Sequence, residues 1–202
     1  IMKKLLLAVF SIPTTFSLYA QREVPQQRME QIYEEVKTPY KYGLAVVPAD
    51  NYHKIDCPTV FRQGNKWLMT YVVYNGKGGT DGRGYETWIA ESDNLLEWRT
   101  LGRVLSYRDG KWDCNQRGGF PALPDMEWGG SYELQTYKGR HWMTYIGGEG
   151  TGYEAVKAPL YVGLAWTKGN ISTAHEWESL DKPILSIHDK DAQWWEKLTQ
   201  YK

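Results

Sequence analysis

The sequence predicts an all-β protein built from a repeated unit of four antiparallel strands. First, aromatic and β-branched runs are separated by glycine-containing turns over most of the chain, which is the pattern of short strands joined by tight turns. Second, the segment 66–71 recurs as 140–145, which is 74 positions later (140 − 66). Third, shorter motifs recur after each copy in the same order. Repetition of this kind indicates a modular β architecture.

The N-terminal residues 1–20 have the three parts of a secretory signal peptide. Lys3 and Lys4 form a positive start, an apolar run follows at 5–10, and a small-residue site ends at Ala20. The apolar run is too short to cross a bilayer. We therefore expect cleavage after Ala20, a secreted or periplasmic protein, and no stable membrane insertion after cleavage.

A leader is expected at residues 21–45. Within it the polar stretch 26–37 can form a short helix, which Pro39 ends because proline cannot continue a helix. The remaining residues, 46–202, contain the strand repeat.

Each copy of the repeat is predicted to contain four strands. Both copies enter their second strand through a tight turn, Gly64-Asn65 in the first and Lys138-Gly139 in the second. The motifs that match after these turns are 84–87 with 152–155, 89–90 with 164–165, 97–98 with 176–177 and 105–106 with 185–186. The expected strands are 58–63, 66–74, 86–92 and 98–105 in the first unit, and 131–137, 140–147, 160–167 and 177–185 in the second.

Four-stranded antiparallel units at a fixed period are typical of a β-propeller, in which each unit is one blade. Blade one is expected at about 55–106, blade two at about 120–186, and the start of a third at 194–202. The alternative is two similar hairpins of a β-sandwich, which the ordered matches disfavour. Because a propeller closes its ring with about four to eight blades, we expect the chain to be the N-terminal part of a longer protein.

Composition and charge exclude several classes of protein. The chain has 24 Lys+Arg and 24 Asp+Glu, so no basic excess is present to bind nucleic acid. Removing residues 1–20 takes away two Lys and no acids, which leaves 22 against 24, a net charge of −2. Two cysteines cannot form a disulfide scaffold. Export would permit a bond between Cys57 and Cys114, but the sequence does not say whether they meet.

Several motifs in the repeat resemble the opening blade of five-bladed propeller glycosidases similar to glycoside hydrolase family 43 and its relatives. The motifs are 55–61 (Ile-Asp-Cys-Pro-Thr-Val-Phe), 84–88, 90–98 and 128–134. The resemblance covers about residues 39–202. It implies a five-bladed ring and a general base, an aspartate at the start of the innermost strand of the first blade. It also implies that a glutamate from a later blade is the general acid. A second aspartate would adjust the pKa of that acid and orient it.

Asp56 is the candidate general base. Hydrolysis of a glycosidic bond needs one carboxyl group to protonate the leaving oxygen and another to activate water or to attack directly. Asp56 lies at the mouth of the expected innermost strand, just before Pro58 and among apolar residues. The alternative is a turn residue that hydrogen-bonds its own backbone.

Asp125 and Glu133 are the candidates for a second carboxylate. Shifting Asp56 by the repeat spacing reaches Gly130, and the two acids flank that position. Asp125 lies in a long interblade loop, where binding residues collect, and Glu133 lies on the expected strand. The alternative for Asp125 is an acid that stabilises its own turn, and the alternative for Glu133 is an acid on the surface of a strand. The general acid itself is expected beyond Lys202.

The remaining candidates are polar and aromatic residues that could bind a sugar. Charged side chains could hold its hydroxyl groups, and indole rings could stack on its apolar face. These residues are Arg83, Glu86, Trp112, Arg117 and Trp128. For Glu86 a structural role is the alternative, because Gly-Tyr-Glu recurs at 152–154. The four histidines do not have the spacing of metal ligands on a helix. No metal or other cofactor is therefore predicted. A central calcium ion, as in some relatives of the family, is left as an alternative.

The sequence therefore predicts an exported glycoside hydrolase that acts on oligo- or polysaccharides by inversion. One alternative is a propeller glycoside phosphorylase, which would need a basic phosphate pocket. The other is a non-catalytic carbohydrate-binding propeller that lacks one of the acids.

Overall fold

The structure is a computed structural model that describes residues 24–37, 43–48, 53–76, 82–153 and 159–193. It divides into an N-terminal unit, residues 1–41, and a second unit, residues 42–202, and each is described by itself. The predicted signal peptide and the start of a third blade at 194–202 lie outside the described residues.

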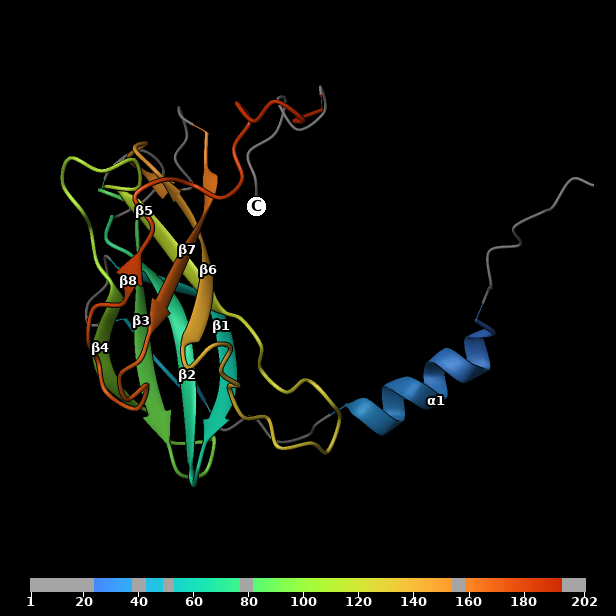
Figure 1. Cartoon of the computed structure of the whole chain (residues 1–202). Coiled ribbons are helices and arrows are strands. Elements are labelled where there is room, and N and C mark those ends of the chain that lie inside the picture. The colour runs from blue at the N-terminus through green and yellow to red at the C-terminus, as the bar shows by residue number, and fades with distance from the viewer. Residues whose placement is uncertain (1–23, 38–42, 49–52, 77–81, 154–158, 194–202) are drawn as a thin grey trace, which may run out of the picture. The chain divides into compact units, whose positions relative to one another are not determined.

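The described part of the N-terminal unit, residues 24–37, contains the helix α1 (Gln26–Val36), which agrees with the helix predicted over 26–37 (Figure 1). Pro25 precedes it, and the Lys37 N–H donates to the Tyr33 carbonyl at its end. All of its residues are exposed. Among the described residues, no helix is long and apolar enough to span a membrane.

The first sheet contains four antiparallel strands in the order β1-β2-β3-β4. The strands are β1 (Lys54–Gln63), β2 (Lys66–Tyr74), β3 (Tyr85–Ser92) and β4 (Arg99–Leu105). The turn between β1 and β2 contains Gly64 at φ +57°, a left-handed conformation that glycine adopts without steric cost. All four strands agree with the predicted first unit to within a few residues.

The second sheet also contains four antiparallel strands, in the order β5-β6-β7-β8. The strands are β5 (Gln116–Pro121), β6 (His141–Gly148), β7 (Tyr161–Thr167) and β8 (Glu178–Ser179). The prediction of its first strand at 131–137 is wrong, because β5 takes that place beside β6. Segment 131–137 instead forms isolated bridges, one of which joins Glu133 to Arg62 of β1.

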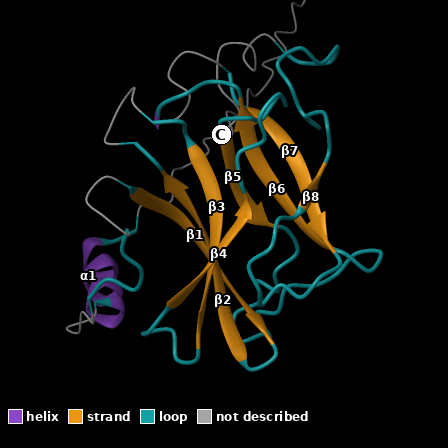
Figure 2. Cartoon of the chain, turned by 90° about the vertical axis from the view of Figure 1, so that its left-hand side faces the viewer, coloured by secondary structure: helices purple, strands orange, loops and turns teal. Residues whose placement is uncertain are grey.

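The two sheets pack face to face, with β5 against β2 and β3 (Figures 1 and 2). Thr87 of β3 joins them, because its hydroxyl donates to the Arg117 carbonyl and accepts from the Gly119 N–H. A Cβ on Gly119 would lie 2.5 Å from the Met143 sulfur of the same sheet and 2.9 Å from Leu105 Cδ1 of the first sheet, so a larger residue would have to displace both side chains. The shared core includes Phe61, Leu68, Ile89, Val104, Leu105, Met143, Tyr145 and Trp177.

The prediction of an all-β protein with two four-stranded antiparallel units is confirmed. The arrangement is that expected for two neighbouring blades, and closure of a ring stays a prediction.

Candidate functional site

Asp56 lies at an irregularity near the start of β1. It pairs with Val72 of β2, but the next regular pair is Thr59 with Thr70, so two residues of β1 face one residue of β2. Such a bulge changes the direction of neighbouring side chains and is common beside active sites. Cys57 within the bulge has φ +52°, a conformation that costs a non-glycine residue about 1–3 kcal/mol.

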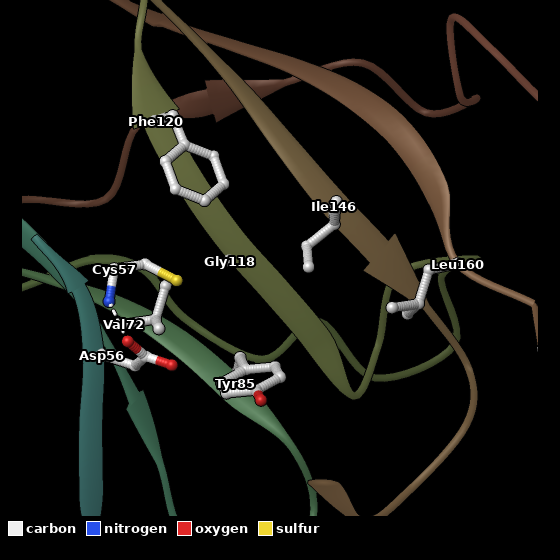
Figure 3. Close-up of a pocket in the computed structure, with 8 residues that line it drawn as sticks. All are labelled: Asp56, Cys57, Val72, Tyr85, Gly118, Phe120, Ile146 and Leu160. Atoms are coloured by element: carbon white, nitrogen blue, oxygen red, sulfur yellow. Dashed lines mark hydrogen bonds between the residues drawn. The ribbon is translucent and has the colours of Figure 1, made fainter. Parts of the chain in front are cut away.

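The Asp56 cavity lies between the two sheets and has a volume of about 210 Å³. Its eight lining residues come from both sheets and from the segment before β7, as Figure 3 shows: Asp56, Cys57, Val72, Tyr85, Gly118, Phe120, Ile146 and Leu160. Apolar and aromatic side chains form most of the wall. Asp56 is the one carboxylate among them, so the cavity places a single acidic group against an apolar surface.

The Asp56 carboxylate has few partners. Its Oδ1 accepts a hydrogen bond from the Cys57 backbone N–H at 2.7 Å (Figure 3). None of the ion pairs found between described residues involves Asp56. Asp56 is exposed to solvent, so its second oxygen is available to accept a proton or a hydroxyl group.

The two other predicted catalytic acids lie at the opposite end of β1. Glu133 is bridged to Arg62, six positions along the strand from Asp56, which corresponds to about 18–20 Å. Two carboxyl groups that act on one glycosidic bond by inversion are about 6.5–9.5 Å apart. The described structure therefore does not bring Glu133 together with Asp56.

Asp125 organises its own loop near Glu133. Its carboxylate accepts hydrogen bonds from the Ser131 backbone and hydroxyl and from the Glu127 N–H, and these bonds lower the pKa of Asp125. Its backbone N–H donates to the Glu133 carbonyl. These contacts support the alternative role of a turn acid. Trp128, in the same loop, is 97% exposed and does not line the Asp56 cavity.

Arg117 and Trp112 contribute to packing rather than to an open surface. The Arg117 side chain is fully buried. It forms an ion pair with Asp113 and donates hydrogen bonds to Glu176, the Ser106 carbonyl and the Ser179 hydroxyl. Trp112 stacks on Tyr145 with ring centroids 5.8 Å apart. These contacts favour a packing role for Arg117, while Trp112 is only partly buried, and a sugar contact at either residue stays a prediction.

Arg83 and Glu86 are near each other in sequence but have different roles. Arg83 ties its turn to the 107–115 segment by hydrogen bonds to Asn115 Oδ1 (2.7 Å) and to the Cys114 carbonyl (3.1 Å), and by an ion pair with Asp109. Glu86 lines a different and larger cavity on the other face of the first sheet. Burial raises the pKa of Glu86, against the lowering effect of Arg103.

The sequence does not single out several residues of the Asp56 cavity. Tyr85 lies between Gly84 and Glu86 in a recurring motif, so its position could be inferred from strand alternation. Phe120 carries no such signal, because β5 is not predicted. Leu160 begins the expected strand 160–167, but its contact with the first sheet is not visible in the sequence. Both cysteines are thiols in the structure, so no disulfide joins them. Among the described residues, no group of three or more His, Cys, Asp or Glu side chains is arranged to hold a metal ion.

Solved structures resemble this chain closely. One named "Glycoside hydrolase" is 94% identical with a TM-score of 0.81, and the match covers 89% of this chain and 51% of that chain. Another, a complex named for BT0996 and RGII, gives the same four values. The chain thus spans about half the length of these proteins. No protein-family model and no curated protein matches the sequence.

A more distant structure is Zg3597, a family 117 glycoside hydrolase produced by the marine bacterium Zobellia galactanivorans. It is 12% identical with a TM-score of 0.46, over 64% of this chain and 38% of that chain. This likeness is too weak to support a conclusion about the chain.

Proposed function

We propose that the protein containing this chain is an exported glycoside hydrolase with a β-propeller domain, of which the two sheets are the first two blades. The observation that carries the proposal is the placement of Asp56. A bulge directs this sparsely bonded carboxylate into an apolar-walled cavity between the sheets. The name of the 94% identical structure supports the same reaction class.

In the proposed reaction, Asp56 acts as a general base. Its oxygen takes a proton from a water molecule, which attacks the anomeric carbon while the bond to the leaving oxygen breaks. A second carboxyl group, from a part of the protein outside the described residues, gives its proton to that leaving oxygen. Water attack from the opposite face inverts the anomeric configuration.

The size of the cavity indicates that other parts of the protein complete the site. Its volume of about 210 Å³ is below the range of roughly 300–1,000 Å³ that is usual for ligand pockets. We infer that the Asp56 cavity is the floor of a larger pocket, and that further blades form the remaining walls.

The proposed substrate is RGII. The solved structure whose name contains RGII is 94% identical to this chain over 89% of its length. At this identity the residues around Asp56 are expected to be largely shared. The chain covers only half of that protein, so the substrate is assigned here as a proposal for the full-length protein.

The test uses full-length protein and purified RGII, with release of sugar measured over time. Asp56→Asn keeps the size of the side chain but removes the base, and should lower kcat by about 10²–10⁴-fold. Asp93→Asn is the matched control, because Asp93 is an exposed acid that follows β3 and pairs with Lys66. It should keep kcat within about twofold. Near-wild-type turnover by Asp56→Asn would overturn the assignment of the base.

The same assay separates the other functions considered from the sequence. Activity that requires added phosphate would indicate a phosphorylase. Saturable binding of RGII without any product would indicate a non-catalytic binding protein. The anomeric form of the first product, read by proton NMR, distinguishes inversion from retention.

A further inference from the structure

The helix α1 has an apolar stripe that the proposed reaction does not use. Met29, Ile32, Tyr33 and Val36 follow one another at intervals of three, one and three residues, which places their side chains on one face of a helix. Charged and amide residues occupy the other positions of α1. The four apolar residues are 40–71% exposed. We call these four residues the α1 stripe.

α1 is too short to be stable by itself. It has 11 residues, and no side chain caps its first turn by a hydrogen bond. Side-chain pairs within it, such as Gln26 with Glu30, stabilise a helix only weakly. Isolated helices shorter than about 12–15 residues are marginal in water, and most helical stability in proteins comes from packing of an amphipathic face. The α1 stripe therefore needs a surface to pack on.

The size of the α1 stripe argues against a second copy of the protein as that surface. A specific interface between separate proteins buries roughly 800 Å² on each partner and involves about 20–30 residues a side. α1 has 11 residues. Docking within one chain avoids most of the translational and rotational free-energy cost of association. A surface as small as the α1 stripe is therefore sufficient only for an intramolecular contact.

The charge of α1 argues against a membrane surface. Helices that lie on membranes are rich in Lys and Arg on their polar face. α1 contains three acidic residues, Glu30, Glu34 and Glu35, and one basic residue, Arg28, which gives a net charge of −2 (1 − 3). Anionic lipids repel such a helix. Its polar side instead fits a protein surface on which basic residues lie beside an apolar groove.

We propose that the α1 stripe docks in an apolar groove with a basic edge, formed by the part of the same protein that lies beyond Lys202. The chain spans about half the length of the 94% identical proteins, so the full-length protein has a comparable length of chain to form this groove. In a closed ring the first blade meets the last, and a leader bound to a later part stabilises that closure. The proposal rests on the longer protein of the proposed function, but not on hydrolysis at Asp56.

Amide hydrogen exchange of residues 26–36 in the full-length protein is the first test. We expect these amides to be protected about 100-fold or more relative to the unfolded chain, because a docked helix exchanges only after local opening. Ile32→Ala should reduce this protection about tenfold or more, although alanine is the best helix former. Gln27→Ala introduces the same residue on the polar face and should not reduce it.

Two results of the exchange experiment would overturn the docking: wild-type amides that exchange as in an unfolded chain, or equal protection in the Ile32→Ala and Gln27→Ala proteins. The thermal unfolding midpoint of each variant shows whether the rest of the protein is folded. If Ile32→Ala does not fold, Val36→Ala takes its place with the same expected direction.

Photo-cross-linking identifies the surface on which the α1 stripe docks. Benzoylphenylalanine in place of Tyr33 introduces a light-activated ring into the stripe of the full-length protein, and peptide mapping finds the residue that it joins. We expect a cross-link within one chain, to a residue beyond Lys202. A product of twice the mass, a cross-link to residues 42–202, a cross-link to added phosphatidylglycerol vesicles, or no product at all would each contradict the proposal.

Failure of the docking and failure of the proposed hydrolase are distinguishable. Full-length protein that hydrolyses RGII while the amides of α1 are unprotected would exclude only the docking. Full-length protein in which α1 is protected and cross-linked beyond Lys202, but which leaves RGII intact, would exclude only the hydrolase.

Discussion

Asp56 and Asp113 are each followed by a cysteine, yet their surroundings are opposite. Asp113 is fully buried. Arg108 Nη2 donates to both of its oxygens at 2.8 Å, Arg117 Nε lies at 3.1 Å, and the Tyr145 hydroxyl donates at 2.7 Å. Asp56 is exposed and, within the described part of the chain, accepts one hydrogen bond, from its neighbour's backbone.

The contrast separates a carboxylate that stabilises the fold from one that is available for chemistry. Both oxygens of Asp113 are directed to internal donors, so this residue has no oxygen left for a substrate. Asp56 keeps an accessible oxygen beside an apolar cavity. A buried and fully bonded charge matters most for stability when one partner is removed, because the others are then left buried and unpaired.

The largest effect is expected for Asp113→Asn. This change removes the buried negative charge that Arg108 and the fully buried Arg117 share, and leaves Glu176 as the remaining counter-charge of Arg117. It should lower the free energy of unfolding by about 3–5 kcal/mol. Asp56→Asn in the same protein should change it by less than about 0.5 kcal/mol, since the side chain is exposed. Chemical denaturation of both variants measures the difference. Equal losses of stability would remove the distinction between the two aspartates.

A smaller effect is expected for Tyr145→Phe. Burial and the charge of Asp113 raise the pKa of Tyr145 well above its ordinary value, so its hydroxyl stays a hydrogen-bond donor. Removing the hydroxyl deletes one buried bond to Asp113 and keeps the ring that stacks on Trp112. The loss should be about 1–2 kcal/mol, again by denaturation. A loss as large as that of Asp113→Asn would mean that ring packing, not the hydrogen bond, had been disturbed.

The smallest effect is a pH dependence that arises from Glu86. Burial raises its pKa in the folded state above the ordinary value of 4.5, so the folded protein holds this proton more tightly than the unfolded chain. The contribution of Glu86 to stability therefore falls as pH rises from about 4.5 through the raised pKa, and is constant above it. Glu86→Gln lacks this titration.

Thermal unfolding between pH 4 and pH 8 tests this expectation. The midpoint of Glu86→Gln should rise relative to wild type as pH increases across the window. A difference between the two proteins that does not vary with pH would contradict the raised pKa.

Much of the fold could be predicted because its signals are local. The strands of the first sheet follow from aromatic and β-branched runs with glycine turns between them, and the short helix follows from a polar stretch before Pro39. The wrong prediction of a strand at 131–137 shows the limit of these local signals. β5 contains Gly118 and Gly119, which have low strand propensity. Its pairing with β6 and its close approach to Val72 and Leu105 of the first sheet are contacts between distant residues, which local signals do not show.

The candidate site was predictable in part. Asp56 stands at the start of an expected innermost strand, and its likeness to a glycosidase motif agrees with the name of the 94% identical structure. The distance of Asp125 and Glu133 from Asp56 could not be predicted from the sequence. It depends on the segment around Glu133 meeting β1 at Arg62, a contact between residues far apart in the sequence.

The sequence by itself therefore determined the all-β class, the four-stranded repeat and the position of Asp56, because strand and turn preferences act over a few residues. Only the tertiary structure decided which charged groups are satisfied. Arg117 and Tyr145 contact Asp113, while among the described residues Asp56 receives one hydrogen bond, from its neighbour's backbone N–H. Charge pairing and burial depend on distances in space, and two Asp-Cys pairs that look alike in the sequence acquire opposite roles for that reason.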